Sequence, residues 1–175
     1  MEQSAQFFFS PENRVAPLGI VAMEGAQELA DKIEAHLVRW ANQAGMNIDT
    51  FRIGCSCPRF SSGDGKGILE SSVRGYDLYF VVDVGNYSCT YKYFGQENHM
   101  SPDDHYQDLK RLIQAAMGKA HRITVVMPLL YGGSTAAATG NLWTAPSRCR
   151  SCNPWAWTTW SPLTPTTPVC RTLCP

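Results

Sequence analysis

LGIVAMEGAQELADKIEAHLVRWANQA, residues 18–44, decides the fold class of this chain. Its first six residues are a continuous apolar run, which is typical of a strand buried on both faces of a sheet. From Gly25 onward the apolar residues recur with the period of a helix, at positions 26, 29, 30, 33, 37, 40, 41 and 44. A buried strand that leads into a long amphipathic helix indicates an α/β architecture.

The same alternation continues along the chain. Ser101 is a plausible N-cap, because Pro102 follows it and two aspartates lie in the first turn of the helix that we expect there. Further strands are expected at residues 47–53, 78–84 (LYFVVDV) and 122–127 (RITVVM). We therefore predict a mostly parallel sheet flanked by helices, with a Gly-rich turn at 63–67 and an unassigned polar excursion at 85–100.

Composition divides the chain of 175 residues near Gly133. Residues 134–175 contain no Asp, Glu, Lys or His, yet hold four of the five tryptophans, four of the seven cysteines and six of the eleven prolines. These prolines interrupt every helix or strand that could be drawn there. We expect an N-terminal extension at 1–16, one α/β domain at 17–133 and a disordered or irregular tail at 134–175.

Charge and hydropathy exclude several classes of protein. Fifteen basic residues balance fifteen acidic ones, so no overall field would attract the chain to nucleic acid or to anionic lipid. No apolar run approaches the roughly 18 residues of a membrane-spanning helix, and the first residues lack the apolar core of a signal peptide. We expect a cytoplasmic protein with reduced cysteines and with no nucleic-acid or membrane partner.

The residues offer few independent signs of catalysis. The segment SSGDGKG at 61–67 could cradle an anion, but its spacing differs from that of a phosphate-binding loop, so a flexible turn is the simpler interpretation. Asp64, Asp83, Asp103 and Asp104 have no spacing that would bring them to one metal, and the last two suit a helix start. The four histidines are scattered, and we assign no catalytic residue, at positions 36, 99, 105 and 121 or elsewhere.

The tail carries one possible metal site. Cys149 and Cys152 form a C-x-x-C pair, and Cys170 and Cys174 form a second, wider pair. Four thiolates could hold Zn²⁺ and fold a segment that cannot bury a core, and the nearby arginines and tryptophans could then bind nucleic acid. A zinc-binding tail of this kind remains an alternative.

A resemblance to a known family lies in RFSSGDGKGILESSVRGYDLYFVV, residues 59–82. This segment resembles the N-terminal domain of ribose-phosphate pyrophosphokinase, whose members carry an RFSDGE segment, then ES-V-R-G, then a strand. Residues 18–37 (LGIVAMEGAQELADKIEAHL) and 119–133 (KAHRITVVMPLLYGG) are similar to further parts of that domain. The resemblance covers about residues 17–133 and is weakest at 86–100, where this chain carries extra residues.

The resemblance implies an activity and a site. The family transfers the diphosphate of MgATP to ribose 5-phosphate, giving phosphoribosyl pyrophosphate and AMP in nucleotide biosynthesis, and the intact enzymes are expected to be homo-oligomers. By the same resemblance Phe60 would stack on adenine, and Asp64 would hydrogen-bond the nucleotide across a subunit interface. Ser62 stands where the family has Asp, so this chain departs from the family's adenine-binding loop at that position.

The family's ATP-gripping arginines and its metal-linked histidine have no counterparts after Gly133. A reading frame shifted by one nucleotide would permit residues 134–139 to read QHRRRH and a later stretch to contain DAHD, which is similar to the continuation expected of the family. We therefore expect a frameshifted, truncated and inactive fragment, whose strand at 122–127 would be left with an exposed edge. A non-catalytic subunit that joins intact synthetases is a further alternative.

Overall fold

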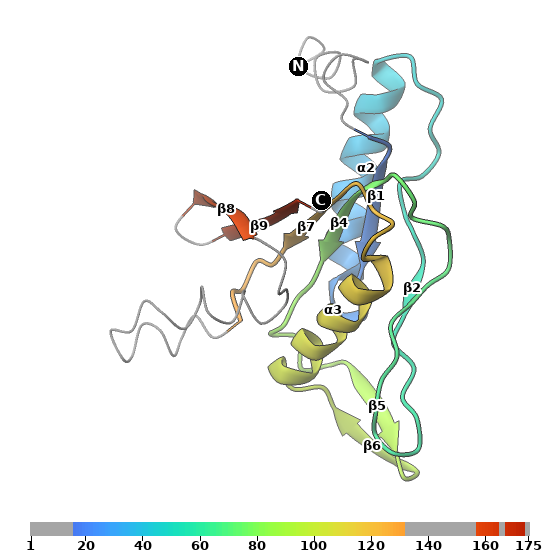
Figure 1. Ribbon diagram of the computed structural model, residues 1–175, viewed down its shortest axis with the longest axis vertical. Coiled ribbons are helices and arrows are strands. Elements are labelled where there is room, and N and C mark those ends of the chain that lie inside the picture. Colours follow the sequence, from blue (N-terminus) through green and yellow to red (C-terminus); the bar gives the residue numbers. More distant parts are fainter. Residues whose placement is uncertain (1–15, 132–156, 165–166, 174–175) are drawn as a thin grey trace.

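The computed structural model describes residues 16–131 in full, and the backbone of residues 157–164 and 167–173. Three parallel strands form its centre: β1 (Leu18–Ala22), β4 (Asp77–Val81) and β7 (Arg122–Val126). β4 lies in the middle of the three, and Leu78 pairs with Gly19 on one side and Ile123 on the other. This confirms the predicted α/β fold with a parallel sheet (Figure 1).

Two helices cover opposite faces of this sheet. The one-turn helix η1 (Glu24–Ala26) leads into α2 (Gln27–Gln43), and α3 (Pro102–Ala116) precedes β7. The predicted cap of α3 is confirmed, because the Asp104 amide donates to Ser101 Oγ at 3.2 Å and the Ser101 amide donates to Asp104 Oδ2 at 2.9 Å. Satisfying these amides with side-chain oxygens fixes where the helix begins.

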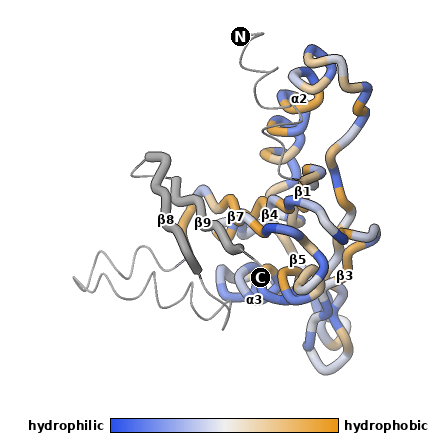
Figure 2. Tube along the Cα trace, turned by 45° about the horizontal axis from the view of Figure 1, so that its top comes forward, coloured by the Kyte–Doolittle hydropathy of each residue, from blue (hydrophilic) through white to orange (hydrophobic). Residues whose placement is uncertain are grey.

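Each helix buries its own cluster of apolar side chains against the sheet. On the α3 face Leu109 and Leu112 pack with alternate residues of β4 and β7, among them Phe80 and Ile123. On the other face Ala30 of α2 belongs to a cluster with residues of all three strands. They are Ile20 and Ala22 of β1, Val81 of β4 and Val126 of β7. The alternation arises because successive strand residues point to opposite faces. Hydrophobic residues accordingly concentrate in the central strands (Figure 2).

Two small hairpins extend from one end of the sheet. β2 (Cys55–Ser56) pairs antiparallel with β3 (Ile68–Leu69), and β5 (Thr90–Tyr93) pairs antiparallel with β6 (Gln96–His99). The second hairpin lies within residues 85–100, the polar excursion for which the sequence predicts no helix or strand. In Figure 1 it lies side by side with the connection between β2 and β3.

Three expectations differ from the structure. Residues 47–53 form no strand of their own and contribute a single parallel bridge, between Arg52 and Ile20. Two strands run through the tail, β8 (Trp157–Thr164) and β9 (Thr167–Leu173), and β9 pairs antiparallel with β7. The expected exposed edge of β7 is therefore covered by β9 backbone.

The two prolines in these strands occupy positions where the ladder tolerates them. Pro162 lies on β8, the outermost strand of the sheet, and prolines within sheets are confined largely to such edge strands. Pro168 pairs only with Pro162, because the β7–β9 ladder ends at the pair Val126 and Val169. The rest of the expected irregular tail, like the N-terminal extension at 1–15, lies outside the described residues.

Within the described part of the chain, no helix combines the length and the apolar character needed to cross a membrane.

Candidate functional site

The turn that links β2 to β3 displays an aromatic ring and a carboxylate at the surface. The Phe60 amide donates to the Asp64 carbonyl at 2.7 Å, and the Gly63 amide donates back to the Phe60 carbonyl at 2.9 Å. Gly63 has φ of +88°, a value that glycine adopts without strain. The closed turn leaves Phe60 54% exposed, and Ser62 Oγ donates to Asp64 Oδ2 at 2.9 Å.

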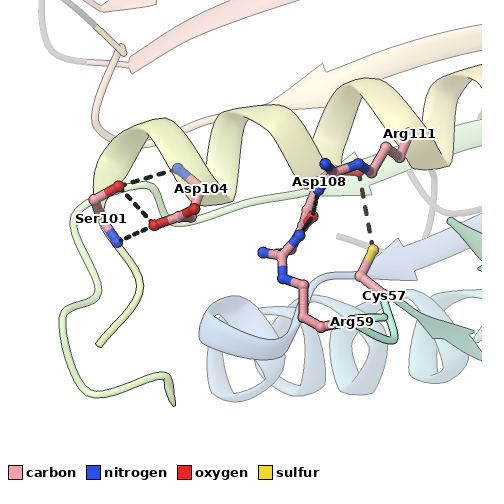
Figure 3. A network of polar contacts seen from close by, with 6 residues as sticks. All are labelled: Cys57, Arg59, Ser101, Asp104, Asp108 and Arg111. Atoms are coloured by element: carbon pink, nitrogen blue, oxygen red, sulfur yellow. Dashed lines mark hydrogen bonds and ion pairs between the residues drawn. The ribbon is translucent and has the colours of Figure 1, made fainter. Parts of the chain in front are cut away.

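A buried ionic network anchors the turn to α3. The Arg59 guanidinium donates to both oxygens of Asp108, at 2.7 and 2.9 Å, and Arg111 donates to Asp108 Oδ1 at 2.7 Å (Figure 3). The side chains of Arg59 and Asp108 are only 7% and 4% exposed. A bidentate pair of this kind fixes the orientation of the guanidinium as well as its position. The residue directly before Phe60 is thus held rigidly.

Two glycines let the turn approach the helix closely. A Cβ on Gly65 would lie 2.4 Å from Arg59 Nη1 and 2.6 Å from Arg111 Nη1. A Cβ on Gly67 would lie 2.6 Å from the backbone carbonyl of Arg111 and 2.7 Å from the amide of Leu112. The second approach is to backbone, which cannot move aside as a side chain can. The glycines of the Gly-rich segment therefore serve packing against α3.

A cavity of about 470 Å³ lies behind the turn. Its walls come from the end of β1, from β2, from β5 and from α3, and they include Cys55, Cys57, Tyr91 and Asp108. Burial raises the pKa of the Cys55 thiol to about 11 and that of the Cys57 thiol to about 12. Both thiols are consequently protonated at neutral pH, which makes them poor nucleophiles. Both cysteines are partly buried.

The structure places the other candidate carboxylates apart. Asp104 belongs to the cap of α3, and Asp103 accepts a hydrogen bond from the Tyr131 hydroxyl. Asp83 follows β4 and accepts from the Gly85 amide at 3.0 Å. Among the residues described, no three His, Cys, Asp or Glu side chains are grouped so that they could hold a metal ion.

His105 is a buried residue with a structural hydrogen bond. His105 is 2% exposed, and its Nε2 lies 2.7 Å from the Asn86 carbonyl, to which it donates. The predicted zinc ligands fall elsewhere: Cys149, Cys152 and Cys174 lie outside the described residues, and of Cys170 only the backbone is described, in β9. The zinc site therefore stays a prediction.

Sequence reasoning missed the anchoring network. Asp108 lies between buried positions of α3, four residues before Leu112, and a carboxylate on the buried face of a helix requires a cationic partner. That placement was a usable signal for the existence of a partner. It could not identify Arg59, which is 49 residues away in the sequence.

A family of known proteins matches the part of the chain that contains this site. The family model for the N-terminal domain of ribose phosphate pyrophosphokinase matches residues 18–138, which is more than half of the chain. No curated protein matches the chain. The matched region contains the parallel sheet, both helices, the anchored turn and the hairpin of β5 and β6. The chain belongs to the family defined by the N-terminal domain of ribose phosphate pyrophosphokinase.

Proposed function

We propose that the turn at residues 59–65 is the adenine contact of a ribose-phosphate diphosphokinase domain, and that this chain binds ATP without turning it over by itself. The exposure of the Phe60 ring on a rigidly anchored turn carries the proposal. A large aromatic ring exposed to water gives the fold little, whereas its face is available to stack on a base.

Asp64 complements that ring. Its carboxylate lies at the surface on the same turn, where Ser62 donates to one of its oxygens. A carboxylate accepts hydrogen bonds only, so it suits the exocyclic amino group of adenine or a ribose hydroxyl. The pair thus offers stacking from Phe60 and a directional contact from Asp64. In an oligomer this turn would serve the nucleotide of a neighbouring subunit.

Diphosphate transfer from ATP to ribose 5-phosphate demands more than this contact. The developing charge on the phosphates must be neutralised by cationic side chains and Mg²⁺. The described residues do not fit a protein-held metal ion, so Mg²⁺ would enter as part of the MgATP substrate. Residues 134–175 supply three arginines but no Lys, His, Asp or Glu. These absences support a chain that does not catalyse the reaction alone.

The composition of the tail supports a frameshift as the cause. We propose that residues 134–175 are read out of frame, and that the family's phosphate-binding segments lie in another frame of the same gene. The nucleotide sequence after the codon for Gly133 tests this directly. An open frame that encodes further synthetase sequence supports the proposal, and an uninterrupted gene whose other frames contain stop codons contradicts it.

Equilibrium dialysis of the full chain against ATP tests the binding. The wild type is expected to bind, and Phe60→Ala should weaken binding by roughly fivefold or more, as the loss of one stacked base predicts. Tyr87→Ala is the matched control, because Tyr87 is 66% exposed but lies outside the turn. Equal binding by the wild type and Phe60→Ala would contradict the proposal. AMP release from ATP and ribose 5-phosphate by the chain alone would contradict its inactivity.

A further inference from the structure

The tip of the hairpin formed by β5 and β6 carries an aromatic residue that the fold does not explain. Phe94 is 77% exposed, the highest value among the large hydrophobic residues described. It also has φ of +48°, and Gly95 after it has φ of +76°, so the two-residue turn needs left-handed backbone at both positions. Such turns favour Asn, Asp or Gly, and a bulky aromatic residue is unfavourable there. Phe94 therefore costs stability and buries little.

The hairpin tip is packed against the anchored turn. A Cβ on Gly63 would lie 2.9 Å from Cε2 of Tyr93, so this ring lies directly over the glycine of the turn. The rings of Tyr93 and Phe94 meet edge to face, with centroids 4.5 Å apart. At the other end of β5 the Arg59 guanidinium lies 4.9 Å from the centroid of the Tyr91 ring. The hairpin and the turn therefore hold fixed positions relative to each other.

These contacts connect the two segments that carry Phe60 and Phe94. Gly63 donates its amide to the Phe60 carbonyl and lies under the Tyr93 ring, and Phe94 is the next residue along the hairpin. The two exposed phenyl rings thus belong to neighbouring segments, and Asp64 lies on the same turn as Phe60. The two segments lie side by side at the same end of the molecule (Figure 1).

We propose that Phe94 is a second aromatic contact for the base of the nucleotide bound at Phe60, so that the hairpin determines affinity for purine nucleotides. The inference rests on the proposed function of the turn. A purine presents two π faces and an edge, and stacking is available to any exposed aromatic ring within reach of them. Phe94 is exposed to solvent and is unfavourable in its turn. Residues that cost stability in this way are expected at functional sites.

The proposal assigns a role to the excursion at residues 86–100. Phe94 adds aromatic surface beside the turn, and its phenyl ring carries no charge or hydrogen-bond donor that could hold the phosphates of the ligand. Substitutions at Phe94 should therefore change binding of ATP and leave binding of inorganic tripolyphosphate unchanged. This difference separates base recognition from any general effect on the charge or fold of the chain.

Isothermal titration calorimetry on the full chain tests the inference, with ATP and tripolyphosphate as probes. Phe94→Asn removes the ring and retains a residue suited to the turn, so it should fold and should weaken ATP binding about fivefold. Phe94→Tyr keeps an aromatic face and should stay within about twofold of the wild type. Tyr87→Ala, the matched exposed aromatic on the same excursion, should bind as the wild type does.

Three results would overturn the inference, and the first two also distinguish it from the proposed function. If Phe60→Ala loses ATP binding and Phe94→Asn binds as the wild type does, the hairpin plays no part, but the proposed function stands. If neither substitution changes ATP binding, both proposals are wrong. A loss of tripolyphosphate binding in Phe94→Asn equal to its loss of ATP binding would also contradict a contact to the base.

Discussion

Removal of the Asp108 carboxylate tests how the turn is held in place. Asp108 accepts two hydrogen bonds from Arg59 and one from Arg111, and its side chain is 4% exposed. Asp108→Ala would leave two guanidinium groups facing each other with no intervening anion. Removing one partner of a buried ion pair costs about 3–5 kcal/mol, because the remaining charge stays buried and unpaired. This is a large part of the roughly 5–15 kcal/mol that stabilises a typical domain.

Urea unfolding followed by circular dichroism measures this loss. For a typical slope of about 2 kcal/mol per molar urea, the midpoint should fall by about 2 M. Arg59→Met combined with Asp108→Leu should recover part of the loss, since apolar residues replace a charge pair instead of leaving half of it. The exposed pair of Glu28 and Lys32, 2.9 Å apart, provides the control, and Glu28→Gln should leave the midpoint unchanged. An Asp108→Ala midpoint equal to that of Glu28→Gln would refute the anchoring role.

Three further predictions concern packing, backbone and pH. Gly67→Ala should destabilise the fold by about 1–3 kcal/mol, because its Cβ would meet the backbone of Arg111, and an unchanged melting temperature would contradict that approach. Phe94→Asn should stabilise the fold by about 1 kcal/mol in urea unfolding by relieving left-handed strain, and a lower midpoint would show that the ring packs. Because burial raises the pKa of Cys55 and Cys57 to about 11 and 12, the free energy of unfolding should hold below about pH 9 and fall as pH rises through 11 and 12. Ultraviolet titration that finds both thiolates by pH 9 would contradict this.

The central strands and helices could be predicted because their signals are local. The apolar runs at 18–23 and 78–84 became β1 and β4, and Ser101 with Asp104 fixed the start of α3. The predicted strand at 47–53 does not form, because this segment makes only a single bridge, between Arg52 and Ile20 of β1. Apolar periodicity can identify a segment that lies beside a strand, but it does not determine how many ladder hydrogen bonds form.

The parts that escaped prediction depend on partners distant in the sequence. Residues 90–93 (TYKY) alternate polar and aromatic side chains, but residues 96–99 (QENH) are polar throughout, so the second strand of the hairpin could not be separated from a loop. The prediction that prolines interrupt every strand of the tail was wrong for β8 and β9. Pro162 lies on an edge strand, and Pro168 lies beyond the end of the ladder between β7 and β9. At the candidate site, the exposed pair of Phe60 and Asp64 came from family resemblance. The buried charges that hold their turn became visible only in three dimensions.

Nuclear magnetic resonance titration of the ¹⁵N-labelled full chain with ATP tests the central claim most directly. The account predicts that the largest amide shifts fall on the turn from Phe60 to Asp64 and on the hairpin tip at Phe94 and Gly95. Signals of α2, which lies on the far face of the sheet from α3, should stay in place. Shifts that fall on α2 while the turn and the hairpin tip stay unchanged would contradict the account.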